Sequence, residues 1–145
     1  MKKAFISVYV LLILLILSLS ISFIYKENES NYENSLDLYN KKVAMFEAES
    51  LLNMTLEEIR VDKENWIDLE KGKIKTESIN NLANNFDKKL DFSIGDYEKE
   101  VDIKIGENER VLSIQSKYKG TISYAIMVYK LDEKGNLKIV YNRVY

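Results

Sequence analysis

Cysteine, histidine and proline are all missing from this chain of 145 residues. Without cysteine, neither a disulfide bond nor a thiolate metal site can form. Without histidine, the chain lacks the commonest general base and the commonest metal ligand. Proline and glycine are both absent between Ser30 and Val61, so no residue there would interrupt a helix.

These absences leave few routes to catalysis. A hydrolase needs a nucleophile and a base within hydrogen-bonding reach, and only serine–lysine or paired-carboxylate solutions remain. The five glycines form no nucleophile elbow, dinucleotide fingerprint or phosphate-binding loop. We therefore expect no catalytic residues, no metal site, no cofactor and no enzymatic activity.

A long apolar segment lies near the start of the chain. Ala4–Tyr25 has 22 residues, of which 18 are apolar, four are serine and none is charged. As a helix it would be about 33 Å long, enough to cross a bilayer core of about 30 Å. Lys2 and Lys3 precede it, whereas Lys26 directly after it is offset by Glu27 and Glu29. The positive-inside rule therefore predicts a cytoplasmic N-terminus, with the remaining chain outside.

Three interpretations of this apolar segment stay open at this point. It could be a secretory signal that is cleaved after small residues such as Ser20 or Ser22. It could be a plain single-pass anchor. The third interpretation depends on the chain that follows.

The segment after Tyr25 carries 19 basic and 23 acidic residues, a net charge of −4. The two signs are interspersed, and no basic stripe typical of nucleic-acid binding occurs. The sequence therefore gives no positive indication of DNA contact and leaves that contact unknown.

The helical pattern continues from Ser30 to about Val61. One apolar stripe, in alternating steps of four and three, comprises Tyr32, Leu36, Tyr39, Val43 and Phe46. A second comprises Leu38, Met45, Ala48, Leu52, Leu56 and Ile59. Together they form a face broader than the single seam of a two-stranded coiled coil. We expect one helix that leaves the membrane and whose distal half packs against a following domain.

The remaining residues predict a globular head. Trp66 is expected to be a core anchor between the long helix and the head. Helical spacing predicts a second helix over 76–90, beginning at Thr76. From Lys99 onward, alternation with a period of two predicts four strands, at 99–105, 112–118, 122–128 and 137–141. Short turns between them favour an antiparallel sheet with one face against the helix and the other toward water or a partner.

The expected fold class is therefore α+β: a long N-terminal helix, half of it transmembrane, packed on a four-stranded antiparallel sheet, with a short second helix. This is the architecture of type IV pilins, and Lys2-Lys3-Ala4-Phe5 before the apolar segment resembles their leader. In that family a membrane peptidase cuts before a phenylalanine, which is then N-methylated. The resemblance implies processing between Ala4 and Phe5, although the family usually has glycine at the position of Ala4.

The fifth mature position, counted from Phe5, is Tyr9. Most major pilins have a glutamate there that meets the amino terminus of a neighbouring subunit. Its absence resembles certain minor pilins, including those at filament tips. The resemblance implies that one face of the membrane helix contacts lipid or other subunits, and this face includes Tyr9, Leu12, Leu15 and Leu19.

A further match lies within residues 44–52. Ala44, Ala48, Glu49 and Leu52 resemble a segment that follows the membrane helix in PilX-like minor pilins and ComGG-type competence pseudopilins. Acidic residues on a helix usually face solvent, and this is the simpler interpretation of Glu49. The resemblance offers another, in which Glu49 pairs with a basic residue of the next subunit.

The resemblance implies a minor pilin or pseudopilin of a type IV pilus, competence or type II secretion filament. Its domains would be a cytoplasmic leader at 1–4, a transmembrane helix at 5–25, an extracytoplasmic helix at 26–62 and the head at 63–145. Its partners would be the membrane, other pilin subunits, a prepilin peptidase and the assembly machinery. Two alternatives remain: a bitopic membrane scaffold that pairs through residues 30–60, and a binding domain that is secreted after cleavage near Ser22.

Overall fold

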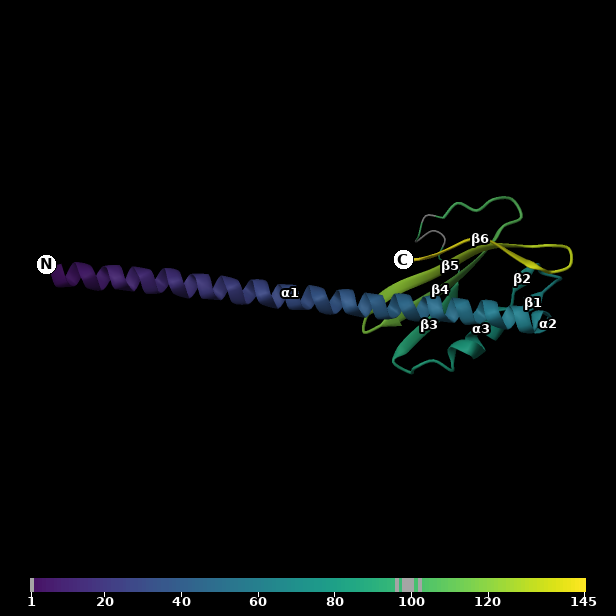
Figure 1. Ribbon diagram of the computed structural model, residues 1–145, viewed down its shortest axis with the longest axis horizontal. Coiled ribbons are helices and arrows are strands. Elements are labelled where there is room, and N and C mark those ends of the chain that lie inside the picture. The colour runs from purple at the N-terminus through teal and green to yellow at the C-terminus, as the bar shows by residue number, and fades with distance from the viewer. Residues whose placement is uncertain (1, 96, 98–100, 102) are drawn as a thin grey trace. The chain divides into compact units, whose positions relative to one another are not determined.

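The computed structural model describes residues 2–95, 97, 101 and 103–145, with the side chains of the first helix described from Ile6 onward. Helix α1 spans Lys2–Val61 and is drawn as one continuous coil in Figure 1. The chain divides into two compact units, residues 1–38 and residues 39–145. The first unit contains only α1, and the second contains the end of α1 together with all other elements.

In the first unit, every residue from Ile6 to Leu38 is exposed. The described portion of α1 includes a window with a mean hydropathy of 2.6, none of which is buried within the protein. A helix segment that is apolar on all sides and exposed is suited to lipid. By length and composition, α1 can therefore cross a membrane once.

The second unit is an α+β domain. After α1 come the short helix α2 (Lys63–Trp66), the two-residue strands β1 (Ile67–Asp68) and β2 (Lys73–Ile74), and helix α3 (Thr76–Ala83). The four longer strands are β3 (Leu90–Gly95), β4 (Arg110–Tyr118), β5 (Thr121–Leu131) and β6 (Leu137–Val144). They form one antiparallel sheet in the order β3-β4-β5-β6, and β1 and β2 form a separate pair. The predicted α+β class and four-stranded antiparallel sheet are confirmed.

Turn chemistry sets the register of this sheet. Tyr118 pairs with Thr121, so that Lys119 and Gly120 alone connect β4 to β5. Both have positive φ, 46° and 87°, as the type I′ form of a two-residue hairpin turn requires. A bulge opposite Val128 and Tyr129 then shifts the pairing of β6.

The core of the head lies between α1 and one face of the sheet. The helix contributes Ala48, Leu51, Leu52 and Ile59, all buried. The strands contribute alternating residues, which are Leu112 and Ile114 from β4 and Ala125, Met127 and Tyr129 from β5. Trp66 is only 8 % exposed and belongs to this core, which confirms its predicted role as an anchor.

The second helix and the first strand differ from the sequence prediction. Helix α3 ends at Ala83 rather than at Leu90, and Leu90 begins β3. The amide of Lys89 donates to Asp87 Oδ1 at 3.1 Å, in a local turn that competes with a longer helix. A strand was also predicted over 99–105. Residues 103–105 have no regular structure, so the prediction is wrong there, and residues 99, 100 and 102 lie outside the described residues.

The other face of the sheet is more covered than expected. Ile126 and Val128 point away from α1 in the alternating pattern of β5, yet both are fully buried. Glu109, in the connection from β3 to β4, has its carboxylate 3.3 Å from the ammonium of Lys130 on β5. Tyr97, earlier in that connection, lies 5.2 Å from the ring of Tyr124, and its hydroxyl lies 3.0 Å from Gln115 Oε1. The connection from β3 to β4 therefore packs against this part of the outer face and shields it from water.

A matched pair of leucine truncations tests the core. We expect Leu51→Ala, at a fully buried site, to lower the free energy of unfolding by about 2–5 kcal/mol. Leu69→Ala removes the same atoms from a side chain that is 63 % exposed. It should change the free energy of unfolding by less than about 0.5 kcal/mol. Denaturant unfolding of the full chain in detergent, followed by Trp66 fluorescence, measures both. Equal losses in the two variants would contradict this core.

Candidate functional site

The predicted processing positions lie in the first turns of α1. Ala4 and Phe5 both have helical backbone, and their side chains are outside the described residues. The structure therefore places these positions at the start of the apolar helix but leaves their recognition by a peptidase as a prediction.

The predicted membrane interface is an exposed face of the same helix. Tyr9, Leu12, Leu15 and Leu19 are between 54 % and 64 % exposed. Their steps of three, three and four residues keep them on one side of α1. Three of the four are aliphatic, and Tyr9 adds an uncharged phenol. A carboxylate at the position of Tyr9 would require a partner in lipid, whereas a phenol carries no charge that needs one.

The structure divides the segment matched at 44–52 between the core and the surface. Ala44 and Ala48 are fully buried and Leu52 is 1 % exposed, at successive steps of four along one side of α1. Glu49 is exposed, in agreement with the simpler interpretation of a solvated acid. The two alanines allow close approach of the helix to its neighbours, because a larger side chain would push them apart.

Glu49 lines a shallow hollow of about 520 Å³ on the outer surface of α1. The other lining residues are Phe46, Ser50, Asn53, Met54, Glu57 and Glu58. Phe46 is 67 % exposed and Met54 is 43 % exposed, so this surface combines apolar side chains with three carboxylates. Phe46 belongs to the broad apolar face expected from the sequence, but the head does not cover this part of that face.

Two buried polar residues of α1 were not singled out from the sequence. Thr55 is fully buried and its hydroxyl donates to the carbonyl of Leu51 at 2.8 Å, so the helix itself satisfies it. Asn40 is 5 % exposed, and its Oδ1 has no hydrogen-bond partner among the described residues. Both occupy positions where the apolar pattern is interrupted, and this interruption is the only sequence signal for them.

A polar cluster joins α2 to the turn between β5 and β6. The ammonium of Lys63 donates to the carbonyl of Lys134, and to Asn136 Oδ1 at 2.9 Å. Within the turn, Asp132 Oδ1 accepts from the amides of Lys134 and Asn136 at 2.9 and 2.7 Å. These hydrogen bonds, above all those from Asn136, lower the pKa of the Asp132 carboxyl below its ordinary value of 3.8.

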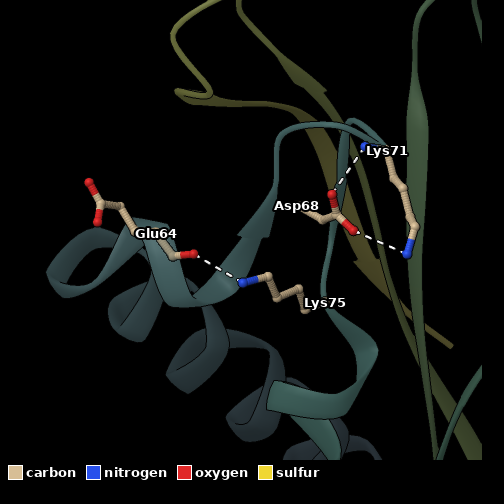
Figure 2. Close-up of polar contacts among 4 residues, drawn as sticks. All are labelled: Glu64, Asp68, Lys71 and Lys75. Carbon is tan, nitrogen blue, oxygen red and sulfur yellow. Dashed lines mark hydrogen bonds and ion pairs between the residues drawn. The ribbon is translucent and has the colours of Figure 1, made fainter.

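Figure 2 shows a second set of polar contacts, around the β1–β2 turn. Asp68 Oδ1 accepts from the amide of Lys71 at 3.1 Å, and Asp68 Oδ2 lies 3.3 Å from the ammonium of Lys71. The backbone hydrogen bond is the main reason that the pKa of Asp68 is lowered. Lys75 donates from its ammonium to the carbonyl of Glu64 at 3.1 Å. These contacts shape turns, and each lysine is already engaged.

Several of the described polar side chains of the head link its turns and strands. Among the residues that the structure describes, no group of three or more metal-ligating side chains comes together. Ser116 and Lys119 have the spacing of a serine–lysine motif, but Ser116 is fully buried on β4 and Lys119 is exposed in the turn. Tyr129 accepts from the amide of Ile74 at 3.1 Å, and its burial raises the pKa of its hydroxyl.

Comparison of the chain with protein-family models, with curated proteins and with solved structures finds no match. The functional argument therefore depends on the residues of α1 and on the domain that packs against its end.

The Asp132 turn generates a pH-dependent prediction. A carboxyl whose pKa is lower in the folded state contributes stability above its unfolded pKa, and this stability is lost as pH falls through the folded value. We expect Asp132→Ala to destabilise the head by a constant amount above about pH 5, and by progressively less below the ordinary pKa of 3.8. Trp66 fluorescence during unfolding at several pH values measures the difference. Glu133→Ala, in the same turn, controls for the lost charge; a destabilisation by Asp132→Ala that does not change with pH would contradict the assignment.

Proposed function

We propose that this chain is a minor pilin or pseudopilin subunit of a type IV pilus, competence or type II secretion filament, and that it is not an enzyme. One observation carries most of the proposal. The 60-residue helix α1 is exposed and apolar at its beginning, whereas its end supplies the core of a small antiparallel domain. A subunit that waits in the membrane and is later extracted into a filament needs both regions on the same helix.

The proposed mechanism is mechanical. The apolar length of α1 retains the free subunit in the bilayer, with Lys2 and Lys3 on the cytoplasmic side. After the leader is removed between Ala4 and Phe5, the apolar helix exchanges lipid contacts for contacts with the equivalent helices of other subunits. The head remains outside the cell membrane, where the filament displays it. The partners are the prepilin peptidase, other pilin subunits and the assembly machinery.

Tyr9 supports a position at the tip or in initiation of the filament. A glutamate at the fifth mature position would neutralise the amino terminus of a neighbouring subunit, and a phenol offers no such charge. A subunit that has no neighbour ahead of it does not need this acid. The finer proposal is therefore that the chain begins a filament and does not form its shaft.

The N-terminus of the mature protein tests the proposed family. We expect co-expression with a prepilin peptidase to remove Met1–Ala4 and to leave an N-methylated Phe5, as measured by mass spectrometry. Ala4→Gly, which restores the residue usual in that family, should be processed at least as completely. A peptidase inactivated at its catalytic site is the control. A mature chain that begins near Phe23 would indicate secretion instead, and an intact Met1 would favour a membrane scaffold.

The position in the filament is tested separately. We expect an epitope-tagged head to be detected at filament ends, with far fewer copies than the major subunit, when sheared filaments are labelled and counted by electron microscopy. Labelling along the shafts at the stoichiometry of the major subunit would remove the tip assignment while leaving the family proposal intact.

A further inference from the structure

Helix α1 carries an exposed apolar stripe that the head does not cover. In the second unit this outer stripe consists of Tyr39 and Phe46, which are 58 % and 67 % exposed, and Val43 between them, which is partly buried. In the sequence, Tyr32 and Leu36 precede them with the same spacing, and both are exposed. Ala44, Ala48 and Leu51, by contrast, are fully buried on another side of the helix.

The spacing of the outer stripe is that of a coiled-coil seam. Steps of four and three place Leu36, Val43 and Ser50 at a positions, and Tyr32, Tyr39, Phe46 and Asn53 at d positions. The core residue Ala44 falls at a b position, and Ala48 falls at an f position, away from this seam. One helix can therefore pack on its own sheet and on a second helix simultaneously.

The surface beside Phe46 has room for a partner side chain. The shallow hollow of about 520 Å³ on α1 begins at Phe46 and continues past Ser50 and Asn53 to Met54. In a parallel pair, a d residue inserts among residues of the facing helix that include the next a position. For Phe46 that position is Ser50, a small residue beside which an aromatic ring can fit.

Charges flanking the seam favour a second copy of the same chain. In a parallel pair, a g residue of one helix faces the e residue five positions later in the other. Lys42 then faces Glu47 of the second copy, and symmetry repeats this attraction. The next flanking pair, Glu49 with Met54, brings no like charges together, and Asn40, at the preceding e position, is buried. The same membrane orientation of both copies provides the parallel direction.

We propose that α1 pairs in parallel with α1 of a second copy of this chain, through the outer stripe from Tyr32 to Asn53. The pair forms between subunits in the membrane and requires neither leader removal nor a filament. It therefore goes beyond the proposed function, and its failure would leave that function untouched.

The lack of native cysteine makes the pair directly testable, because any disulfide must come from an introduced residue. Leu36→Cys and Val43→Cys place single thiols at a positions, where a parallel pair brings equivalent residues close enough for a disulfide. Asn34→Cys and Lys41→Cys, which lie at exposed f positions in the same turns, are matched controls. The full chain is expressed without other pilin subunits, and its membranes are mildly oxidised. We expect the seam variants to form a disulfide-linked dimer of twice the monomer mass at least about fivefold faster than the controls.

Charge exchange provides an independent measurement in the Val43→Cys background. Lys42→Glu or Glu47→Lys alone should slow cross-linking, because each places like charges opposite one another, and the two changes together should restore it. Equal cross-linking at seam and control positions, or no dimer at any position, would overturn the proposal. A cross-linked product whose mass shows a different partner would overturn it as well.

Discussion

The close packing of the end of α1 on the sheet is the contact on which the rest of the head depends. Ala48 is fully buried there, and its small side chain allows the helix to lie close to β4 and β5, while Leu51, Leu52 and Ile59 fill the space beside it. The same core holds Trp66 of α2 and Ile79 of α3. A small domain without disulfides has few other sources of stability, so this helix–sheet contact carries most of it.

Helix α1 thus meets different surroundings along and around its length. From Ile6 to Leu38 all of its side chains are exposed, and its apolar beginning is suited to lipid. Toward its end, one side belongs to the core and another side remains exposed, with Phe46 and Met54 next to the carboxylates of Glu49 and Glu57. Each environment follows from side-chain chemistry at a fixed helical spacing. The function proposed for the chain uses the apolar beginning of α1, and the pairing proposed for it uses the exposed side near the head.

Periodic apolar patterns allowed much of this fold to be predicted. The long helix and the three strands after residue 110 follow from residue spacing, because burial on one face imposes it. The core role of Trp66 follows from its large aromatic side chain at the junction of helix and head. The first strand was missed because Phe86 and Leu90 match a helical spacing by coincidence, whereas the turn at Asp87 and the alternation of Leu90, Phe92 and Ile94 determine the structure. The contact of Lys63 with Asn136 joins residues 73 positions apart, and no local pattern encodes it. Of the candidate site, the sequence predicted the apolar helix but not which side of its second half the head covers.

The proposed function requires that α1 crosses a membrane once and that the head lies on the side opposite Lys2 and Lys3. Because the chain has no native cysteine, single thiols report this topology directly. Glu133→Cys places a thiol in the exposed β5–β6 turn, and Lys3→Cys places one before the apolar helix. In cells whose outer barriers admit the reagent, a maleimide that cannot cross the cytoplasmic membrane should label Glu133→Cys at once, and Lys3→Cys only after that membrane is permeabilised. Labelling in the reverse order, or recovery of the uncleaved chain outside the membrane fraction, would contradict the account.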